Sequence, residues 1–288
     1  MHSAVRQMID NYQCQTSTDY VHALREIMQE ISLLGLWRAN FFNKAAFYGG
    51  TALRLIYGLD RYSEDLDFSL LCPDTSFTLD KYISPLSEEL ASYGFDVEIE
   101  HKQKTASSAI QSAFLKTNTM QQILSISANE EIANQIPHGK LLKIKFEVDT
   151  EPPPKFKTEI KYLLHPIPFS VNSYLLPDLF AGKMHAILCR NWKGRTKGRD
   201  WYDLVLYASN FPELHLEHLQ ERLWQGGQLD KTKQLDANLF STMINTSIES
   251  LDVRQAKQDV MPFLKNDDKL SIWSSDFFKE VVSRIVLV

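Results

Sequence analysis

Apolar residues between Thr18 and Leu36 recur at spacings of three and four, the period of one helix face. The positions that follow this period are Val21, Leu24, Ile27, Met28, Ile31 and Leu34. The pattern predicts a long helix with one buried face.

The next segments change rapidly from one period to another. "KAAFYGG" is a short apolar run stopped by two glycines, "TALRLIYGL" has a helical pattern, and "SEDLDFSLL" alternates like a strand. A helix in "LDKYISPLSEELASYGF" and a strand in "DVEIEHKQ" follow. These patterns predict strand, helix, strand, helix and strand in that order.

From residue 108 to residue 150 the pattern is strand-like, and "LLKIKFEVDTEPPP" alternates until its triple proline. A strand around "HPIPFSVNSYLL" leads into a helix, "PDLFAGKMHAILCRN". The next segment, "WKGRTKGRDWYDLVLYASN", is a basic loop followed by a second helix. From Pro212 onward the chain reads as all-helical, in "LEHLQERLWQ", "LDANLFSTMINTSIES" and "SSDFFKEVVSRIVL".

This order predicts an α+β fold, a mixed sheet with flanking helices followed by a helical C-terminal bundle. We place the domain boundary near residue 210, with an α+β domain and its N-terminal helices at 1–210 and a helical domain at 211–288.

Composition narrows the function classes. The 288 residues carry a formal net charge of -5, with 44% hydrophobic and 23% charged residues, which is ordinary for a soluble globular protein. A protein that binds nucleic acid over its whole surface is normally basic, so any such contact must come from a local patch. The N-terminus lacks the apolar core of a signal peptide, no apolar run is long enough to span a membrane, and three cysteines show no CxxC spacing. We expect a cytoplasmic protein with no membrane contact.

Asp65 and Asp67 are the first candidate site. Alternate strand residues share a face, so both point away from Leu66 and Phe68, roughly 7 Å apart along the strand. Two such carboxylates repel unless a proton or a cation intervenes. Hard oxygen ligands suit Mg²⁺ or Mn²⁺, ions that hold nucleotide phosphates.

Gly49 and Gly50 form the second candidate site. They lie between a strand and a helix, where glycine lets the backbone approach a ligand closely. The helix start at Thr51 offers free N–H groups to an anion, and Arg54 and Arg61 add positive charge. Either feature alone is commonly structural, a simple turn or a solvated strand face. Their succession along the chain favours a functional site.

This order resembles the nucleotidyltransferase fold of the polymerase-beta superfamily. The segments "FYGGTALR", "RYSEDLDFSL", "KIKFEVDT", "LFAGKMHAILCR" and "GRDWYDL" resemble the AbiEii/AbiGii-type nucleotidyltransferase toxins of bacterial toxin–antitoxin and phage-defence systems. The resemblance runs from Phe47 to Leu204. The helical C-terminal region carries no matching motif.

The resemblance implies Mg²⁺-dependent (or Mn²⁺-dependent) transfer of a nucleoside monophosphate from an NTP to an acceptor such as tRNA or another RNA, restrained by a cognate antitoxin. It implies that Asp65 and Asp67 ligate the metal, with Glu147 or Asp149 as the third acid. It implies that Lys183 and one of Asp200 and Asp203 belong to the catalytic set. The expected nucleotide-binding residues are Gly49, Gly50, Thr51, Arg54, Ser63, Lys145 and Arg199.

The later residues also have structural readings. Lys183 lies at the edge of an apolar helix stripe, so it either reaches solvent or points into a polar cleft. Asp200 and Asp203 share a helix face, where an acidic side chain near the N-terminus favours the helix dipole. The run "RNWKGRTKGRDW" is either a phosphate-binding patch, with Trp192 and Trp201 stacking on bases, or a solvated loop with two buried tryptophans.

Two other functions fit parts of the pattern. A DxD glycosyltransferase would use a nucleotide sugar and Mn²⁺, although the glycine turn one helix before the DxD argues against it. An NTP-binding interaction protein with this fold and no turnover would have lost a catalytic acid, whereas both aspartates are present. The choice of NTP and of acceptor stays open.

Overall fold

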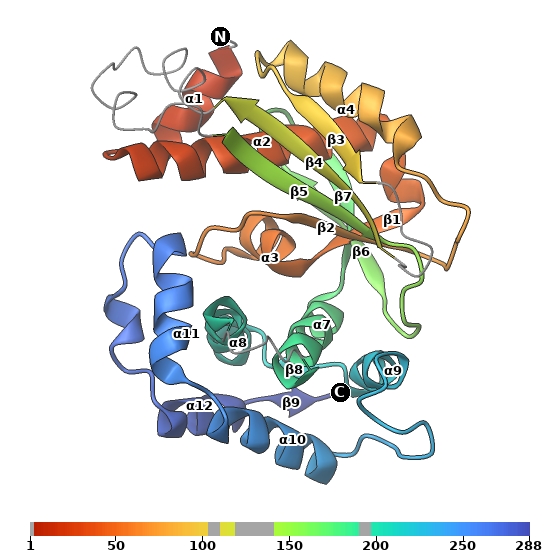
Figure 1. Cartoon of the computed structure of the whole chain (residues 1–288), viewed down its shortest axis with the longest axis vertical. Helices are drawn as coiled ribbons and strands as arrows, with labels where there is room; N and C mark the ends of the chain where they lie inside the picture. Colours follow the sequence, from red (N-terminus) through yellow and green to blue (C-terminus); the bar gives the residue numbers. More distant parts are fainter. Residues whose placement is uncertain (1–2, 103–109, 119–140, 190–196) are drawn as a thin grey trace. The chain divides into compact units, whose positions relative to one another are not determined.

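The computed structural model describes residues 3–102, 110–118, 141–189 and 197–288 (Figure 1). The chain divides into two compact units. The first contains 1–56, 62–152 and 160–173, and the second contains 57–61, 153–159 and 174–288.

A mixed seven-stranded sheet forms the centre of the first unit, in the order β3-β4-β5-β2-β1-β7-β6. β1 pairs antiparallel with β2 and parallel with β7, β2 pairs parallel with β5, and β3, β4 and β5 are antiparallel. The strands are β1 Ala45–Tyr48, β2 Leu66–Leu70, β3 Glu98–Lys102, β4 Ile110–Asn118, β5 Leu141–Asp149, β6 Thr158–Leu163 and β7 Phe169–Tyr174.

Helices of the first unit pack with this sheet and with one another. The described ones are α1 Ser3–Tyr12, α2 Ser17–Arg38, α3 Gly49–Tyr57 and α4 Asp80–Ser92, with a 3-10 turn at Phe41–Asn43. The predicted long helix is confirmed as α2, which begins at a capping box between Thr16 and Asp19. Figure 1 shows α2 lying along the sheet, and it packs against α1, α4 and β5.

The two sheet faces have opposite character. Phe47, Phe68 and Phe146 come from three neighbouring strands and stack in the core, with ring centroids 5.3 Å and 4.7 Å apart. Their burial explains why these strands form: each apolar side chain is removed from water against α2 and its neighbours. The residues between them in sequence therefore lie on the other face, which carries the candidate acids.

The second unit is mainly helical. Its elements are α7 Leu176–Cys189, α8 Gly198–Asn210, α9 Leu216–Gln225, α10 Ala237–Glu249, α11 Val253–Val260 and α12 Ser275–Val282, with 3-10 turns at Met261–Phe263 and Asp268–Leu270. Phe180 stacks on Tyr207 at 4.4 Å, and Trp201 contacts Phe278 at 4.9 Å. These aromatic contacts join α7 to α8 and α8 to α12.

The α+β class and the helical C-terminal part are confirmed, with three differences. The pattern did not predict β6. The expectation of an all-helical chain after Pro212 is wrong, because β8 (Glu213–Leu214) and β9 (Val286–Leu287) form a parallel pair. The second unit takes in α7 and α8, which the sequence pattern assigns to the first domain. In the described residues, no helix is long and apolar enough to cross a membrane.

Candidate active site

Asp67 lies in a row of three side chains across the sheet. Its pairing partners are Tyr48 on β1 and Glu147 on β5. Paired residues of adjacent strands project to the same face about 4.8 Å apart. Asp67 and Glu147 are both partly buried, so two carboxylates are held as neighbours on the face opposite the aromatic core.

Asp65 is fixed just before β2 by its backbone. The buried Thr51 hydroxyl donates to the Asp65 carbonyl oxygen and shares a 2.9 Å hydrogen bond with the Ser63 hydroxyl. The Gln29 amide, also buried, donates to the Ser63 carbonyl oxygen at 3.2 Å. Thr51 and Ser63, expected to contact the nucleotide, thus have side chains that position the segment carrying Asp65.

Gly49 lies directly against the Asp67 carboxylate. Its backbone has φ +84°, a conformation that side chains with a Cβ rarely adopt. A Cβ at this position would lie 2.6 Å from Asp67 Oδ2. A side chain on any other residue at this position would therefore collide with the Asp67 carboxylate.

The strand register separates the two candidates for the third acid. Glu147 pairs with Asp67, whereas Asp149 pairs with Ser69, two residues further along β2. The Asp149 carboxylate also accepts a hydrogen bond from the Glu151 N–H at 3.0 Å. Lys145 places its Nζ 2.7 Å from Glu147 Oε1. Glu147 is therefore the acid nearest the aspartate pair, with a lysine beside it.

The residues present fit a divalent ion in the kind of ligand that they offer. Asp67 and Glu147 offer hard carboxylate oxygens on paired strands, and Asp65 lies just before the first of these strands. Across the described ranges, no three histidine, cysteine or acidic side chains converge closely enough to hold an ion. Binding an ion here requires these side chains to turn toward one another.

Arg54 is engaged within the first unit rather than offered to a phosphate. Its guanidinium pairs with Glu26, with Nη2 3.1 Å from Oε1, and its Cζ lies 4.2 Å from the Tyr62 ring centroid. This pairing anchors α3 to α2. This geometry favours a structural role for Arg54 over the expected contact with a nucleotide.

Four charged residues form a cluster in the second unit. Arg61 bonds Asp203 through two parallel contacts, both 2.6 Å. Lys183 Nζ lies 2.7 Å from Asp200 Oδ1 and 2.8 Å from Asp203 Oδ2. All but Lys183 are almost completely buried. Lys183 therefore points into a polar cluster and not to solvent, and the two aspartates share a helix face as expected.

The aspartates keep both cations charged. Burial by itself lowers the pKa of the Lys183 ammonium, but Asp200 and Asp203 outweigh it and raise that pKa above its ordinary value. Burial and Asp203 act in the same opposed way on Arg61, whose pKa is also raised. Two cations and two anions thus compensate one another.

The basic run is described only in part. Arg190, Trp192, Lys193 and Arg195 lie outside the described residues. Arg199 Cζ lies 4.3 Å from the Phe263 ring centroid, and its Nε lies 3.9 Å from Asp259 Oδ2. Trp201 is buried against Phe278, which agrees with the second of the two readings, that of a buried tryptophan, and not with stacking on a base.

Two neighbours of the site were not predicted. Tyr48 pairs with Asp67, and the alternation of its strand places it on the acidic face. Gln29 is a buried polar residue within the apolar pattern of α2, where sequence periodicity gives no sign of its hydrogen bond to Ser63.

Comparison with known proteins gives a family. A family model described as "Nucleotidyl transferase AbiEii toxin, Type IV TA system" matches residues 32–280. No curated protein sequence matches the chain.

Two solved structures from Helicobacter pylori are similar. JHP933 has a TM-score of 0.52 and 18% identity, over 91% of this chain and 89% of that one. A structure titled as a putative nucleotidyltransferase has a TM-score of 0.49 and 19% identity, over 90% of this chain and 91% of that one. The likeness to JHP933 supports the fold.

Proposed function

Because the chain belongs to the AbiEii family of nucleotidyltransferase toxins, we propose that it transfers a nucleoside monophosphate from an NTP to RNA. The family is one of toxin–antitoxin systems, so a cognate antitoxin restrains the activity. The proposed acceptor is a hydroxyl group of tRNA or another RNA.

Asp65 and Asp67 are the proposed ligands of Mg²⁺, with Glu147 as the third acid. The support is their placement: one residue just before β2, a second within it, and the residue paired with the second on β5. When bound, the ion neutralises phosphate charge and orients the α-phosphate.

The chemistry breaks one bond and forms one. The acceptor oxygen attacks the α-phosphorus, the bond between the α-phosphorus and the bridging oxygen breaks, and pyrophosphate leaves. The hydroxyl proton passes to a base, and we assign Glu147 to that role because it lies beside Asp67. Lys145, whose Nζ lies 2.7 Å from Glu147 Oε1, positions that carboxylate.

The glycine turn and the helix start are the proposed phosphate cradle. Gly49 and Gly50 bring the backbone close to Asp67, and the first turn of α3 presents N–H groups to an anion. Lys183 is proposed to supply positive charge in the reaction, and Asp200, 2.7 Å from its ammonium nitrogen, is proposed to orient it. Asp203, fully buried and bonded twice by Arg61, is assigned to holding Lys183 in place.

The contact of Gly49 with the Asp67 carboxylate carries the proposal. A Cβ on this glycine, which opens a helix, would lie 2.6 Å from the carboxylate of an acid on the next strand. A purely structural turn has no need of a carboxylate there.

The test is a labelling assay with the full-length protein. The protein is incubated with Mg²⁺, each α-³²P-NTP in turn, and total bacterial tRNA or the proteins of a cell extract. The double variant Asp65→Asn/Asp67→Asn runs beside it, because each amide keeps the shape and removes the charge.

Label in RNA that disappears in the double variant supports the proposal and names the base and the acceptor class. Label in protein moves the acceptor to a side chain. If no label transfers while NTP still binds, the chain is a nucleotide-binding protein and the proposed reaction is wrong.

A further inference from the structure

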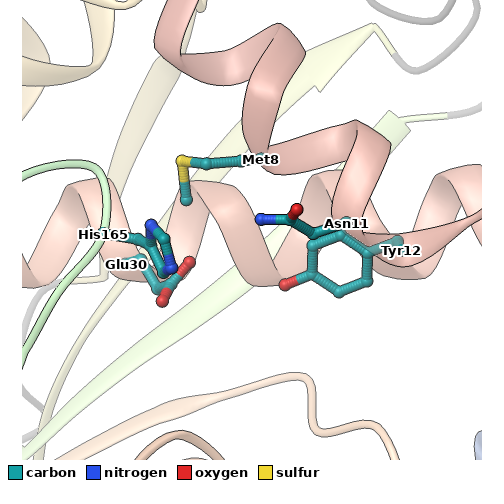
Figure 2. Close-up of a pocket in the computed structure, with 5 residues that line it drawn as sticks. All are labelled: Met8, Asn11, Tyr12, Glu30 and His165. Atoms are coloured by element: carbon teal, nitrogen blue, oxygen red, sulfur yellow. The ribbon is translucent and has the colours of Figure 1, made fainter.

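A surface cavity of about 150 Å³, open to solvent, lies in the first unit, apart from the residues of the candidate active site. Its walls are Met8, Asn11 and Tyr12 of α1, Glu30 of α2, and His165 of the turn between β6 and β7. In Figure 2 the Glu30 carboxylate and the His165 ring lie on one side, with Asn11 and Tyr12 on the other.

Glu30 is the unusual member of this cavity. Its carboxylate makes no hydrogen bond or ion pair with any residue that the structure describes. Burial raises the pKa of Glu30 to about 8, and the negative charge of Glu26 raises it further than Arg54 lowers it. The carboxylate therefore has no cation of its own in the described part of the chain.

The neighbouring charges are already paired. Glu26, one helical turn before Glu30, binds Arg54 of α3 and accepts a 2.8 Å hydrogen bond from the Tyr12 hydroxyl. The Tyr12 proton is thus used, and its oxygen can only accept further bonds. Figure 2 shows the Asn11 amide nitrogen toward Met8, and half a turn of this amide presents its carbonyl oxygen there instead. Met8 supplies an apolar wall.

We propose that this cavity binds a primary ammonium group carried on a short aliphatic chain. An ammonium has three donors and no acceptor. Glu30, Asn11 and Tyr12 can each offer an oxygen acceptor, one for each of the three donors. Glu30 also supplies the opposite charge. The methylene groups would lie against the Met8 thioether.

The size of the cavity supports this ligand over others. At about 30 Å³ for each water-sized group, the volume holds roughly five such groups, which is enough for a small alkylammonium. A divalent ion prefers several anionic oxygens. Glu30 is the one carboxylate in the lining.

Calorimetry with n-propylammonium and the full-length protein tests the proposal. We expect millimolar binding that is at least tenfold tighter at pH 9 than at pH 6, because Glu30 must lose its proton. At pH 7 the binding should release close to one proton, measured by repeating the titration in buffers of different ionisation enthalpy. Glu30→Gln keeps the side-chain shape and should bind at least tenfold more weakly at pH 9.

The controls separate this site from general attraction. Glu88→Gln removes an exposed acid of α4 and should bind like the wild type, and n-propanol should not bind. Asn11→Ala should weaken binding without abolishing it. No heat at pH 9, or equal affinity in the Glu30→Gln variant, overturns the proposal.

A further arm identifies the source of the ammonium. N-acetyl-lysine methylamide carries the same group as a lysine side chain of a partner protein. If it binds more tightly than n-propylammonium, the site receives a lysine; if it binds more weakly, the site receives a free amine.

Discussion

Gly49 joins the backbone turn to the acid that follows it on the next strand. Its φ of +84° and the 2.6 Å that would separate an added Cβ from Asp67 Oδ2 both require glycine. Gly58 has a similar φ of +77°, but a Cβ there meets nothing within 4 Å. Substitution of Gly58 therefore introduces backbone strain alone, whereas substitution of Gly49 introduces the same strain and a collision with the Asp67 carboxylate.

We predict that Gly49→Ala lowers the rate of nucleotidyl transfer by roughly 100-fold. The added Cβ would push the Asp67 carboxylate away from its position, and a shift of about 1 Å in a catalytic group can cost that much in rate. Gly58→Ala should leave transfer within threefold of the wild type. Both should lose about 1 kcal/mol or more in the free energy of unfolding from left-handed strain. Initial rates and denaturant melts check this, and equal rates for the two variants would contradict it.

His218 is a buried neutral imidazole. Nδ1 donates to the Pro154 carbonyl oxygen at 2.8 Å, and Nε2 accepts from Arg222 at 3.0 Å. Burial lowers the pKa of His218 to about 3, and the Arg222 charge lowers it too, against the effect of the Pro154 carbonyl.

This pKa has a consequence for acid stability. The unfolded chain binds a proton at His218 near pH 6.5, whereas the folded chain resists it down to about pH 3. Stability from His218 is therefore complete above pH 6.5 and falls by up to about 1.4 kcal/mol per pH unit below it. His218→Asn should show a shallower loss between pH 6.5 and pH 4 in urea melts. The same slope in both proteins would show that His218 does not resist protonation.

For single residues, the sequence predicted where the acids lie better than it predicted the contacts of their neighbours. Spacing alone places Asp65 and Asp67 on one face, because strand alternation is a local property. The partners of Thr51, Ser63 and Arg54 lie on other elements, 12 to 34 residues away in the pairs observed. Such contacts depend on packing, which leaves no mark on the local pattern.

Close packing between α8 and α11 depends on a glycine at the start of α8. A Cβ on Gly198 would lie 1.8 Å from the Ala256 carbonyl oxygen, a backbone atom that cannot move alone. Gly182 within α7 is different, because a Cβ there meets Arg222 Cζ at an ordinary 3.5 Å.

We predict that Gly198→Ala lowers the free energy of unfolding by about 3 kcal/mol, by forcing the helices apart. Gly182→Ala should raise it by about 0.5 to 1 kcal/mol, because alanine favours the helix interior. Denaturant melts of the two variants decide the matter. A Gly198→Ala protein as stable as the wild type would mean that α8 and α11 do not touch as described.

Element prediction succeeded where a period extends over many residues and failed where it does not. α2 has 22 residues and a sustained helical period. β8 and β9 have two residues each, too few for any period to show. β6 was missed because its apolar residues Ile160 and Tyr162 are exposed, so alternation gives no guide to a buried face.

The whole chain alternates between the two units in six segments. A boundary near residue 210 was expected because composition and pattern become helical there. The contacts that assign α7 and α8 to the second unit, such as Trp201 with Phe278, join residues far apart in sequence. The family match across residues 32–280 spans both units, so the activity is assigned to the chain as a whole.

The most direct test of the proposed centre is the Mg²⁺-dependent rate of label transfer from α-³²P-NTP by Glu147→Gln and Asp149→Asn. Both variants remove one charge from β5, two residues apart, and only Glu147 pairs with Asp67. The account predicts a loss of roughly 100-fold or more for Glu147→Gln, as for removal of a general base, and a rate within threefold of the wild type for Asp149→Asn. Full activity in Glu147→Gln, or an equal loss in Asp149→Asn, would contradict the assignment of the acidic sheet face.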